Sequence, residues 1–336
     1  MTRKKITIAE IAERANVSIA TVSRIINGKD KVKAETRQKV LSVMNELNFI
    51  PPPSVTLSDG FSKIILICIP GFENPFNSPV IDGAQKAAYE QGYEVLILQS
   101  RDYYTDSIDY QNILKHNSIA GIIIVASVPN SDLLDELSFR CPVVMCSEYV
   151  EKYGISYVSI DDVAAAKNAV KYLISTGRKK IGFINSNMNF KYSRHRQKGY
   201  LQALQEAGLE INPNWSVNIT SINYQMALAN ATHILSLNDR PDAFFTCSDV
   251  FAVSVVNAAK KLGLSVPKDV SVVGFDNIET AIMSEPPITT VAQPCFQLGF
   301  QACELLIEKI INPQTADKQI ILSTNLIVRE STDLAK

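Results

Sequence analysis

The chain has 336 residues, 46% of them hydrophobic and 20% charged, and a formal net charge of −1. The composition is typical of a globular protein, and the length exceeds what one hydrophobic core usually organises, so we expect several domains. No apolar stretch approaches the roughly 20 residues of a membrane-spanning helix, and the polar first residues lack the apolar core of a signal peptide. These features argue against a membrane protein, and we expect a cytoplasmic location.

Positive charge is concentrated at the N-terminal end. Residues 1–50 contain ten Lys or Arg and five Asp or Glu, which gives +5 there and leaves −6 for the remainder. Basic side chains that displace counterions from phosphates supply the sequence-independent part of DNA affinity. The asymmetry favours a DNA-binding head on an acidic body, although a solvated charged surface explains the charge alone equally well.

The first fifty residues show the pattern of three short helices. Apolar residues at i, i+3, i+4 and i+7 predict a first helix over residues 7–14. Ser18 is placed to cap a second helix by accepting a hydrogen bond from the backbone N–H near Thr21, and the Asn-Gly pair at Asn27 ends that helix. A third helix is expected from about residue 35. Three such helices sharing one small core form a helix-turn-helix domain.

In a helix-turn-helix domain the second helix enters the major groove of DNA. Its expected exposed residues are Ile19, Ala20 and Arg24. Arg24 is suited to a bidentate contact with guanine, whereas Ile19 and Ala20 offer only apolar contact, for instance to a thymine methyl group. A three-helix domain that binds protein is the alternative. The side chains expected to contact phosphates are Thr7, Ser18, Thr21 and Asn27.

After residue 60, apolar runs of strand length alternate with amphipathic stretches, and the alternation begins again near residue 164. Continuous apolar strands are typical of parallel sheets with helices on both faces. We expect an α/β body of two similar halves, with a small-molecule cleft at the carboxyl ends of the strands. The predicted strands are 64–69, 94–98, 121–125, 143–146, 157–160, 181–184, 243–246 and 270–275; the predicted helices are 80–91, 106–115, 164–175, 199–207, 227–237 and 251–262.

Catalytic and metal-binding patterns are missing from the sequence. The six cysteines lack the short paired spacing of a zinc site and are expected to be reduced and buried, and the three histidines have no second ligand at helical spacing. Neither Gly-x-Ser-x-Gly nor a phosphate-binding P-loop occurs. We therefore expect no metal, no cofactor and no enzymatic activity, with a solute receptor or an enzyme of the same fold as the less favoured alternatives.

The run ITIAEIAERANVSIATVSRIING, residues 6–28, resembles the DNA-binding signature of the LacI/GalR family nearly residue for residue. The resemblance continues through residues 33–37 and 46–49, with Lys33 where the family prefers Ser. It implies an all-α helix-turn-helix head joined to a body of the periplasmic-binding-protein-like type I fold, with two parallel-sheet subdomains and a ligand cleft. It also implies a homodimeric repressor that binds a pseudo-palindromic operator in double-stranded DNA under the control of a small effector.

The resemblance extends over nearly the whole chain and implies its division into domains. Segments at 71–76, 159–162, 195–200, 274–276 and 286–291 resemble the family's effector module, in which the chain crosses three times between the halves. The expected divisions are a head at 1–50, a hinge or linker at 51–60, and an effector and dimerisation domain at 61–336, with an N-subdomain at 61–160 and 292–322 and a C-subdomain at 161–291 and 323–336.

Carried over by position, the resemblance also implies the effector site. Arg196 matches the family's effector-clamping arginine in the pattern Arg-x-x-Gly-Tyr, and Ser147 and Glu148 stand where many sugar-responsive members have Asp-Arg. Such a site suits a ligand with several hydroxyls or ring nitrogens. The other expected contacts are Phe76, for which a core position is equally plausible, and Asn77, Ser248 and Asp276.

The effector class stays open at this stage. A sugar is favoured, but the segments CSEY, SIDD and TCSDVFA resemble nucleoside-responsive members of the family, so a nucleoside or purine is the alternative. A third possibility is that a phosphocarrier protein controls the body in place of a small ligand.

The linker departs from the family pattern. Members typically have a short hinge helix that inserts a leucine into the minor groove, whereas here Pro52 replaces an Asn, Val55-Thr56 replaces Ala-Arg, and Ser58 stands at the leucine position. β-Branched residues are poor helix formers, so any hinge helix should be weak without DNA. A stiff spacer outside the groove is the alternative. We expect Leu57, one residue early, to contact the central base step.

Overall fold

The computed structural model describes residues 7–26, 63–99, 119–125, 141–150 and 154–332, with isolated residues between 33 and 47 and between 134 and 140. Asn27, the linker at 51–60 and the helix expected at 106–115 lie outside the described residues. None of the described helices is long and apolar enough to cross a membrane. All six cysteines are buried and free, which confirms the expected reduced packing role.

Two helices of the head are fully described, α1 (Ile8–Ala15) and α2 (Ile19–Ile26). The Thr7 side chain caps α1 by accepting a hydrogen bond from the backbone N–H of Glu10 at 3.3 Å. The backbone N–H of Thr21 donates to Ser18 Oγ at 3.1 Å, which confirms the predicted cap of α2. The predicted small core is present, and its buried members are Ile11, Ala12, Ala15, Val22, Ile25, Val40 and Met44.

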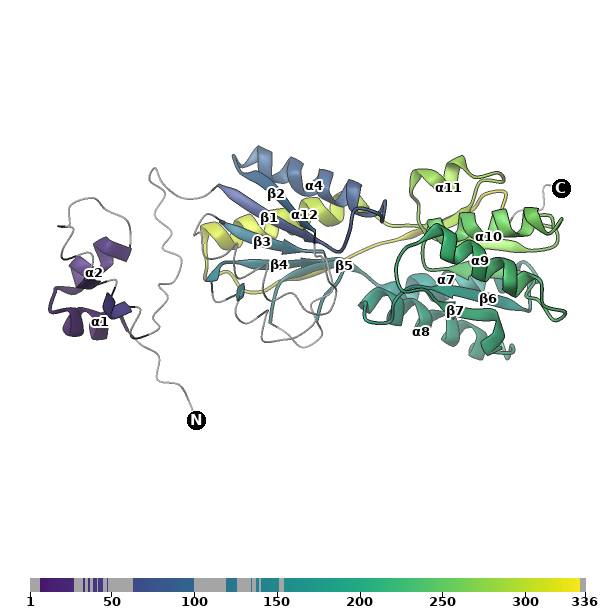
Figure 1. The fold of residues 1–336 in the computed structure, drawn as a ribbon, viewed down its shortest axis with the longest axis horizontal. Helices are drawn as coiled ribbons and strands as arrows, with labels where there is room; N and C mark the ends of the chain where they lie inside the picture. The colour runs from purple at the N-terminus through teal and green to yellow at the C-terminus, as the bar shows by residue number, and fades with distance from the viewer. Residues whose placement is uncertain are drawn as a thin grey trace.

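The body contains two sheets, each of six strands in the described part of the chain (Figure 1). The first has the order β11-β5-β4-β3-β1-β2 and the second β12-β10-β9-β8-β6-β7. The strands of the first sheet are β1 (Ile64–Ile69), β2 (Glu94–Gln99), β3 (Gly121–Ile124), β4 (Val143–Cys146), β5 (Tyr157–Ile160) and β11 (Gln319–Leu322). Those of the second are β6 (Ile181–Asn185), β7 (Ser216–Asn218), β8 (Ala243–Thr246), β9 (Ser271–Asp276), β10 (Thr289–Ala292) and β12 (Asn325–Ile327).

Helices cover both sheets. On the first sheet α4 (Asn77–Glu90) packs against α12 (Cys295–Ile311), although more than two hundred residues separate them. The two backbones approach closely at Gly83 and Gly299, since a Cβ would lie 2.0 Å from Phe296 O on the first and 1.8 Å from Val80 O on the second. On the second sheet α7 (Asp162–Ser175) packs against α8 (Lys191–Glu206), and α9 (Tyr224–Leu235) against α10 (Asp249–Lys261). The short α11 (Glu279–Met283) and a 3-10 turn (Pro213–Trp215) complete the second half.

The chain passes between the two sheets at three places. It leaves the first sheet after β5, returns between β10 and α12, and leaves again between β11 and β12. Consequently each half is assembled from segments distant in sequence, and the connections run side by side between the halves (Figure 1).

Several sequence predictions need correction. The predicted parallel sheets are confirmed, and only the edge strand β12 of the described strands pairs antiparallel, with β10. The second-half helix predicted at 199–207 begins eight residues earlier, at Lys191, because its first turns are polar and show no apolar periodicity. Strands β7 and β10 to β12 and helices α11 and α12 were not predicted.

Candidate functional site

The residues predicted to contact base edges, Ile19, Ala20 and Arg24, lie on α2. Ser18, Ala20 and Arg24 are exposed, and the Ile19 side chain is 57% exposed although it is apolar. The hydroxyl groups of Ser18 and Thr21 are hydrogen-bonded to each other at 2.8 Å, so two of the expected phosphate contacts lie together at the start of the helix. Of the residues predicted to contact DNA, Thr7, Ser18, Ile19, Ala20 and Arg24 are exposed and Thr21 is half-buried, while Asn27 and Leu57 lie outside the described residues.

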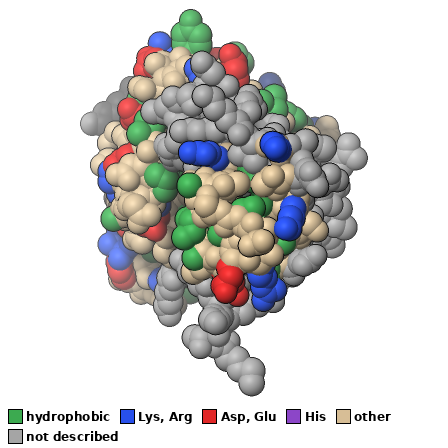
Figure 2. All heavy atoms as spheres, turned by 90° about the vertical axis from the view of Figure 1, so that its left-hand side faces the viewer, with side chains coloured by type: hydrophobic (Ala, Val, Ile, Leu, Met, Phe, Trp, Pro, Cys, Tyr) green, Lys and Arg blue, Asp and Glu red, His purple; other side chains and the backbone are tan. Residues whose placement is uncertain are grey.

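The described Lys and Arg side chains at this end of the molecule are dispersed. Figure 2 faces the end of Figure 1 at which α1 and α2 lie, and its Lys and Arg side chains are separated by polar and apolar surface. Arg24 is exposed on α2, whereas Arg14, also exposed, lies 3.9 Å from Glu10 of the same helix. Both arginines are therefore exposed and positively charged, but Arg24 lies on α2 and Arg14 lies on α1.

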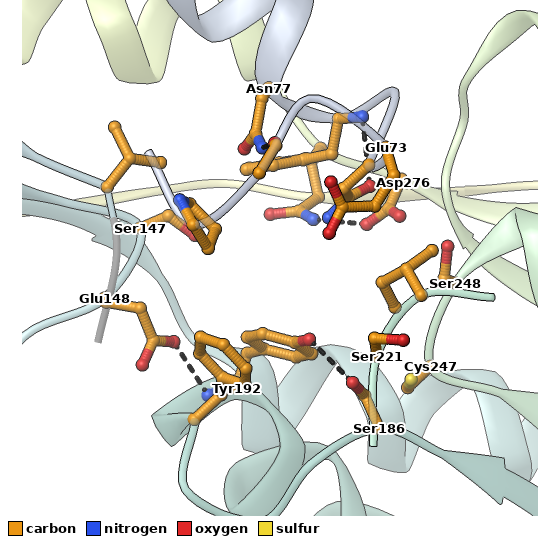
Figure 3. Close-up of a pocket in the computed structure, with 18 of the residues that line it drawn as sticks. Glu73, Asn77, Ser147, Glu148, Ser186, Tyr192, Ser221, Cys247, Ser248 and Asp276 are labelled. Carbon is orange, nitrogen blue, oxygen red and sulfur yellow. Dashed lines mark hydrogen bonds between the residues drawn. The ribbon is translucent and has the colours of Figure 1, made fainter. Parts of the chain in front are cut away.

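A pocket lies between the two halves of the body, with about 650 Å³ of empty space that includes its opening to solvent. It is lined from the first half by the loop after β1 and the end of β4, and from the second half by α8 and the ends of β8 and β9 (Figure 3). The structure brings all the predicted effector residues to this pocket: Phe76, Asn77, Ser147, Glu148, Arg196, Ser248 and Asp276.

Arg196 is held in a fixed position beside the pocket. Its Nε donates to Asp162 Oδ1 at 2.9 Å, its Nη1 donates to the carbonyl of Cys247 at 2.6 Å, and Nη1 lies 3.5 Å from Asp276 Oδ1. The guanidinium carbon lies 3.6 Å from the centre of the Phe275 ring. A charged group that is 3% exposed needs such compensation, so Arg196 is part of the core as well as of the pocket wall.

Lys191, which sequence reasoning missed, is a second buried cation. Its Nζ contacts Asp162 Oδ2 at 2.9 Å and donates to the Ser147 carbonyl at 2.8 Å and to Ser159 Oγ at 2.9 Å. Burial alone would raise the pKa of Asp162, but Lys191 and Arg196 outweigh that effect and hold it below its usual value. The polar segment around Lys191 carries no periodicity that could have identified this residue.

Glu148 joins the two halves. Its carboxylate accepts hydrogen bonds from the backbone N–H groups of Lys191 at 2.7 Å and Tyr192 at 3.0 Å, which are the first residues of α8 (Figure 3). A helix N-terminus has unpaired N–H groups and a partial positive charge, both of which a carboxylate satisfies. Burial raises the pKa of Glu148, and Lys191 and the two N–H groups oppose that rise. Glu148 therefore caps a helix of the opposite half.

Asp276 follows β9 and closes the pocket from the second half. Its pKa is raised to about 6. Burial is the main cause of the rise, and the Arg196 guanidinium and hydrogen bonds from Gln293 and Ser248 oppose it. Gln293 Nε2 donates to Asp276 Oδ1 at 2.7 Å. The neighbouring Asp249 accepts a hydrogen bond from Thr290 Oγ1 at 2.6 Å. Its pKa is raised well above the usual value, mainly by burial and secondly by the charge of Asp276.

The remaining predicted residues have structural bonds of their own. Asn77 Nδ2 donates to the Gly71 carbonyl at 2.7 Å and so fixes the loop after β1. Ser248 caps α10. Ser147 adopts a left-handed backbone conformation, φ 67°, which directs its carbonyl to Lys191. Gly71, Glu73 and Asn74 also line the pocket and belong to the segment 71–76 that resembles the effector module. The sequence analysis did not assign the remaining lining residues to the pocket: Pro70, Val125, Ser186, Phe190, Tyr192, Ser221, Ile222, Cys247 and Gln293.

Comparison with known proteins agrees with this geometry. Residues 7–52 match the family "Bacterial regulatory proteins, lacI family", and residues 170–332 match "Periplasmic binding protein-like domain". The chain is 31% identical over 328 residues to the HTH-type transcriptional repressor CytR of Escherichia coli (strain K12), covering 97% of this chain and 96% of that protein. It is 33% identical over 331 residues to the NTD biosynthesis operon regulator NtdR of Bacillus subtilis (strain 168), covering 97% and 99%. The solved structure of a transcriptional regulator CelR–cellobiose complex superimposes with a TM-score of 0.74 at 26% identity, covering 97% and 100%.

Proposed function

Because the chain belongs to the lacI family of bacterial regulatory proteins, a family of DNA-binding transcription regulators, we propose that it represses transcription as a homodimer on a pseudo-palindromic operator. A small molecule in the pocket between the halves would change operator affinity. The observation that carries this function is that one chain combines an exposed α2 in the head with a pocket built from both halves of the body. No catalytic step is part of it, and the proposed site of action is the cytoplasm.

Contacts with DNA are assigned from exposure and chemistry. Ile19, Ala20 and Arg24 are exposed on α2 and are proposed to face base edges in the major groove. Arg24 is the one of these three that can discriminate a base by hydrogen bonds. Contacts to phosphates, which hold the head in register, are assigned to Thr7, Ser18, Thr21 and Asn27.

The test of the DNA site uses two exposed arginines. Selection from random DNA should return a near-palindrome, and Arg24→Ala should reduce discrimination at one position of each half-site by about 5- to 150-fold, the value of one bidentate contact. Arg14→Ala removes the same charge from α1 and should lower affinity uniformly while reducing its salt dependence. A selected site without two-fold symmetry, or equal effects of the two variants on discrimination, would contradict the proposal.

The linker is proposed to contact DNA through Leu57. A leucine side chain wedged at the central base step opens the groove and bends the operator. The Leu57→Ala variant should therefore bend the operator less than the wild type does, whereas Ser58→Ala should bend it as much. If neither variant changes bending, the linker is only a tether between head and body.

The effector is proposed to be a sugar that contacts Phe76, Asn77, Ser147, Glu148, Arg196, Ser248 and Asp276. Two similar proteins support this class, the ribose operon repressor of Haemophilus influenzae, at 30% identity, and the transcriptional regulator CelR, solved as a complex with cellobiose. A thermal-shift screen with sugars, sugar phosphates, nucleosides and purines tests it, because a ligand at 100 times its Kd adds about 2.7 kcal/mol of stability. Operator affinity measured with each hit should change, and the change should be reciprocal between the two ligands. Hits that leave operator affinity unchanged would contradict effector control.

A further inference from the structure

Lys191 connects the two halves of the body beside the end of β4. It is the first residue of α8 in the second half, yet its Nζ donates to the Ser147 carbonyl at 2.8 Å and to Ser159 Oγ at 2.9 Å, both in the first half. Its backbone N–H donates to Glu148 Oε2 at 2.7 Å. Its Nζ also lies 4.3 Å from the centre of the Tyr149 ring. Four residues of the first half therefore hold one residue of the second half.

The first half builds this site for the ammonium group with bonds of its own. Ser159 Oγ donates to the Ser147 carbonyl at 2.7 Å, so the two acceptors of Lys191 are fixed beside each other. The Tyr149 ring stacks on the Tyr157 ring with their centroids 4.2 Å apart. Neutral oxygen acceptors and the face of an aromatic ring both attract an ammonium cation. The first half therefore forms the site, and Lys191 of the second half fills it.

Lys191 also bonds to both ends of a crossing between the halves. The chain leaves the first sheet after β5, which contains Ser159, and enters the second half at α7, whose first residue is Asp162. Nζ of Lys191 bonds to Ser159 before the crossing and contacts Asp162 Oδ2 at 2.9 Å after it. A rotation of the halves about this crossing would move Ser159 relative to Asp162, and Lys191 could not follow both. The lysine therefore restrains the angle between the halves.

The same network reaches the pocket through Asp162. Its Oδ1 accepts from Arg196 Nε at 2.9 Å, while its Oδ2 contacts Lys191. Arg196 lines the pocket, whereas Lys191 is 2% exposed and is not among the described residues that line it. One buried carboxylate thus joins a side chain that a ligand can touch to a side chain that spans the halves. A substitution of Lys191 therefore tests the junction without removing a lining residue.

The other side of the pocket is more open to solvent. Figure 3 shows Glu148, which bonds to α8, at one side of the cavity and Glu73 and Ser221 at the other. Glu73 is exposed, and the adjacent Phe72 side chain is 61% exposed. Exposed side chains lose little when the halves separate, whereas the buried ion pairs of Lys191 resist separation. The halves should therefore open at the side of Glu73 and Ser221 when the bonds of Lys191 are broken.

We propose that Lys191 is a positioning residue that holds the two halves at the angle of this structure, and that this angle sets operator affinity. The proposal rests on the proposed function of the chain as an effector-controlled regulator. It places part of that control outside the pocket, so that replacing the lysine changes operator affinity without any small molecule.

The angle is measured with spin labels on Phe72→Cys in the first half and Gln225→Cys in the second. Both positions are exposed and lie within three residues of pocket-lining residues of opposite halves, and the six native cysteines are buried. Double electron–electron resonance on the full chain gives the distance between the labels. An excess of unlabelled chain ensures that a dimer carries at most one labelled subunit.

A matched pair of lysine variants tests the position of the halves. Lys191→Met keeps an unbranched side chain, removes the charge and leaves Arg196 to pair with Asp162. It should shift the label distances to longer values. Lys198→Met removes an exposed lysine two turns further along α8 and should leave the distances unchanged.

Operator affinity is measured for the same two variants on the site selected from random DNA, with no small molecule present. Lys191→Met should change the Kd by about fivefold or more, the usual size of coupling between two sites. Lys198→Met should change it by about twofold or less.

Ser159→Ala tests the bond from the first half. It should lengthen the label distances by less than Lys191→Met does, and adding it to Lys191→Met should change nothing further, because Ser159 acts through the lysine. A role of Lys191 confined to α8 would make the two effects independent. If circular dichroism shows that Lys191→Met does not fold, Ser159→Ala decides the test, because it leaves both ion pairs of Asp162 in place.

Failure of the inference can be distinguished from failure of the proposed function. Unchanged label distances, independent effects of Ser159→Ala and Lys191→Met, or longer distances with unchanged operator affinity would overturn the inference. The proposed function survives those results provided that a small molecule in the pocket still alters operator affinity. Absence of operator binding by the wild type overturns the proposed function, and the label distances alone then decide whether Lys191 holds the halves.

Discussion

The head and the pocket differ in how far their functional residues are exposed and in which residues they bond to. The described residues assigned to DNA contacts lie between Thr7 and Arg24, are largely exposed and make local bonds such as Ser18 to Thr21. The pocket residues come from both halves, and those predicted from the sequence are buried, with bonds such as that of Glu148 to Lys191 of the other half. In the head, binding and stability can be changed separately. In the pocket, Glu148 also bonds to the opposite half, so a change there alters stability as well as the pocket.

The largest effect is expected from Arg196→Ala. The change leaves the Asp162 and Asp276 carboxylates without one of their cations in a buried site, so stability of the body should fall by about 3–5 kcal/mol. Urea denaturation followed by a signal from Trp215 measures it. Arg194→Ala, which removes an exposed arginine two residues away, should cost less than about 0.5 kcal/mol. If the two variants lose the same stability, Arg196 does not stabilise the body and acts only on the ligand.

The next effect concerns pH. Because burial raises the pKa of Asp276 to about 6, the folded protein binds a proton there that the unfolded chain has released. Stability should therefore fall as pH rises between about 4 and 6, by an amount on the order of 2 kcal/mol. Asp276→Asn should remove most of this fall when unfolding is measured across the range. Since Asp249 is coupled to the same site and its pKa is also raised, a wild-type fall that survives in Asp276→Asn would assign the titration to Asp249 instead.

A smaller effect is expected from Glu148→Ala, which removes the carboxylate that caps α8 from the other half. Two backbone N–H groups then lose their acceptor, at a cost of about 1–2 kcal/mol. Hydrogen exchange should quicken at the amides of Lys191 and Tyr192. Glu206→Ala at the exposed end of the same helix provides the control, and unchanged exchange at Lys191 would mean that water replaces the cap without loss.

The smallest effect is expected in the head. Ser18→Ala removes the cap of α2 and should cost about 1 kcal/mol of head stability, while Ser18→Asn should retain most of it because asparagine also caps helices well. Thermal unfolding of the head in the full chain, monitored by circular dichroism, checks the order of stability of the two variants. Equal losses in both variants would mean that Ser18 contributes through its hydroxyl pair with Thr21.

The features that the sequence determined depend on short-range patterns of residues. The start and cap of α2, the exposed positions beside it and the strands β1, β4, β5 and β8 matched their predictions, since capping and apolar runs act within a few residues. The residues around Arg196 and Asp276 were located by resemblance to a family, and the structure gathers them at one pocket.

Tertiary structure decided the rest. Helix α8 begins at Lys191 because Glu148 supplies an acceptor from the other half, and no local periodicity records that contact. Lys191 is buried because Asp162 compensates its charge, and Gln293 lies at the pocket because the chain crosses back between the halves after β10. Each of these placements depends on a partner distant in sequence, so its energy appears only when the two halves are assembled.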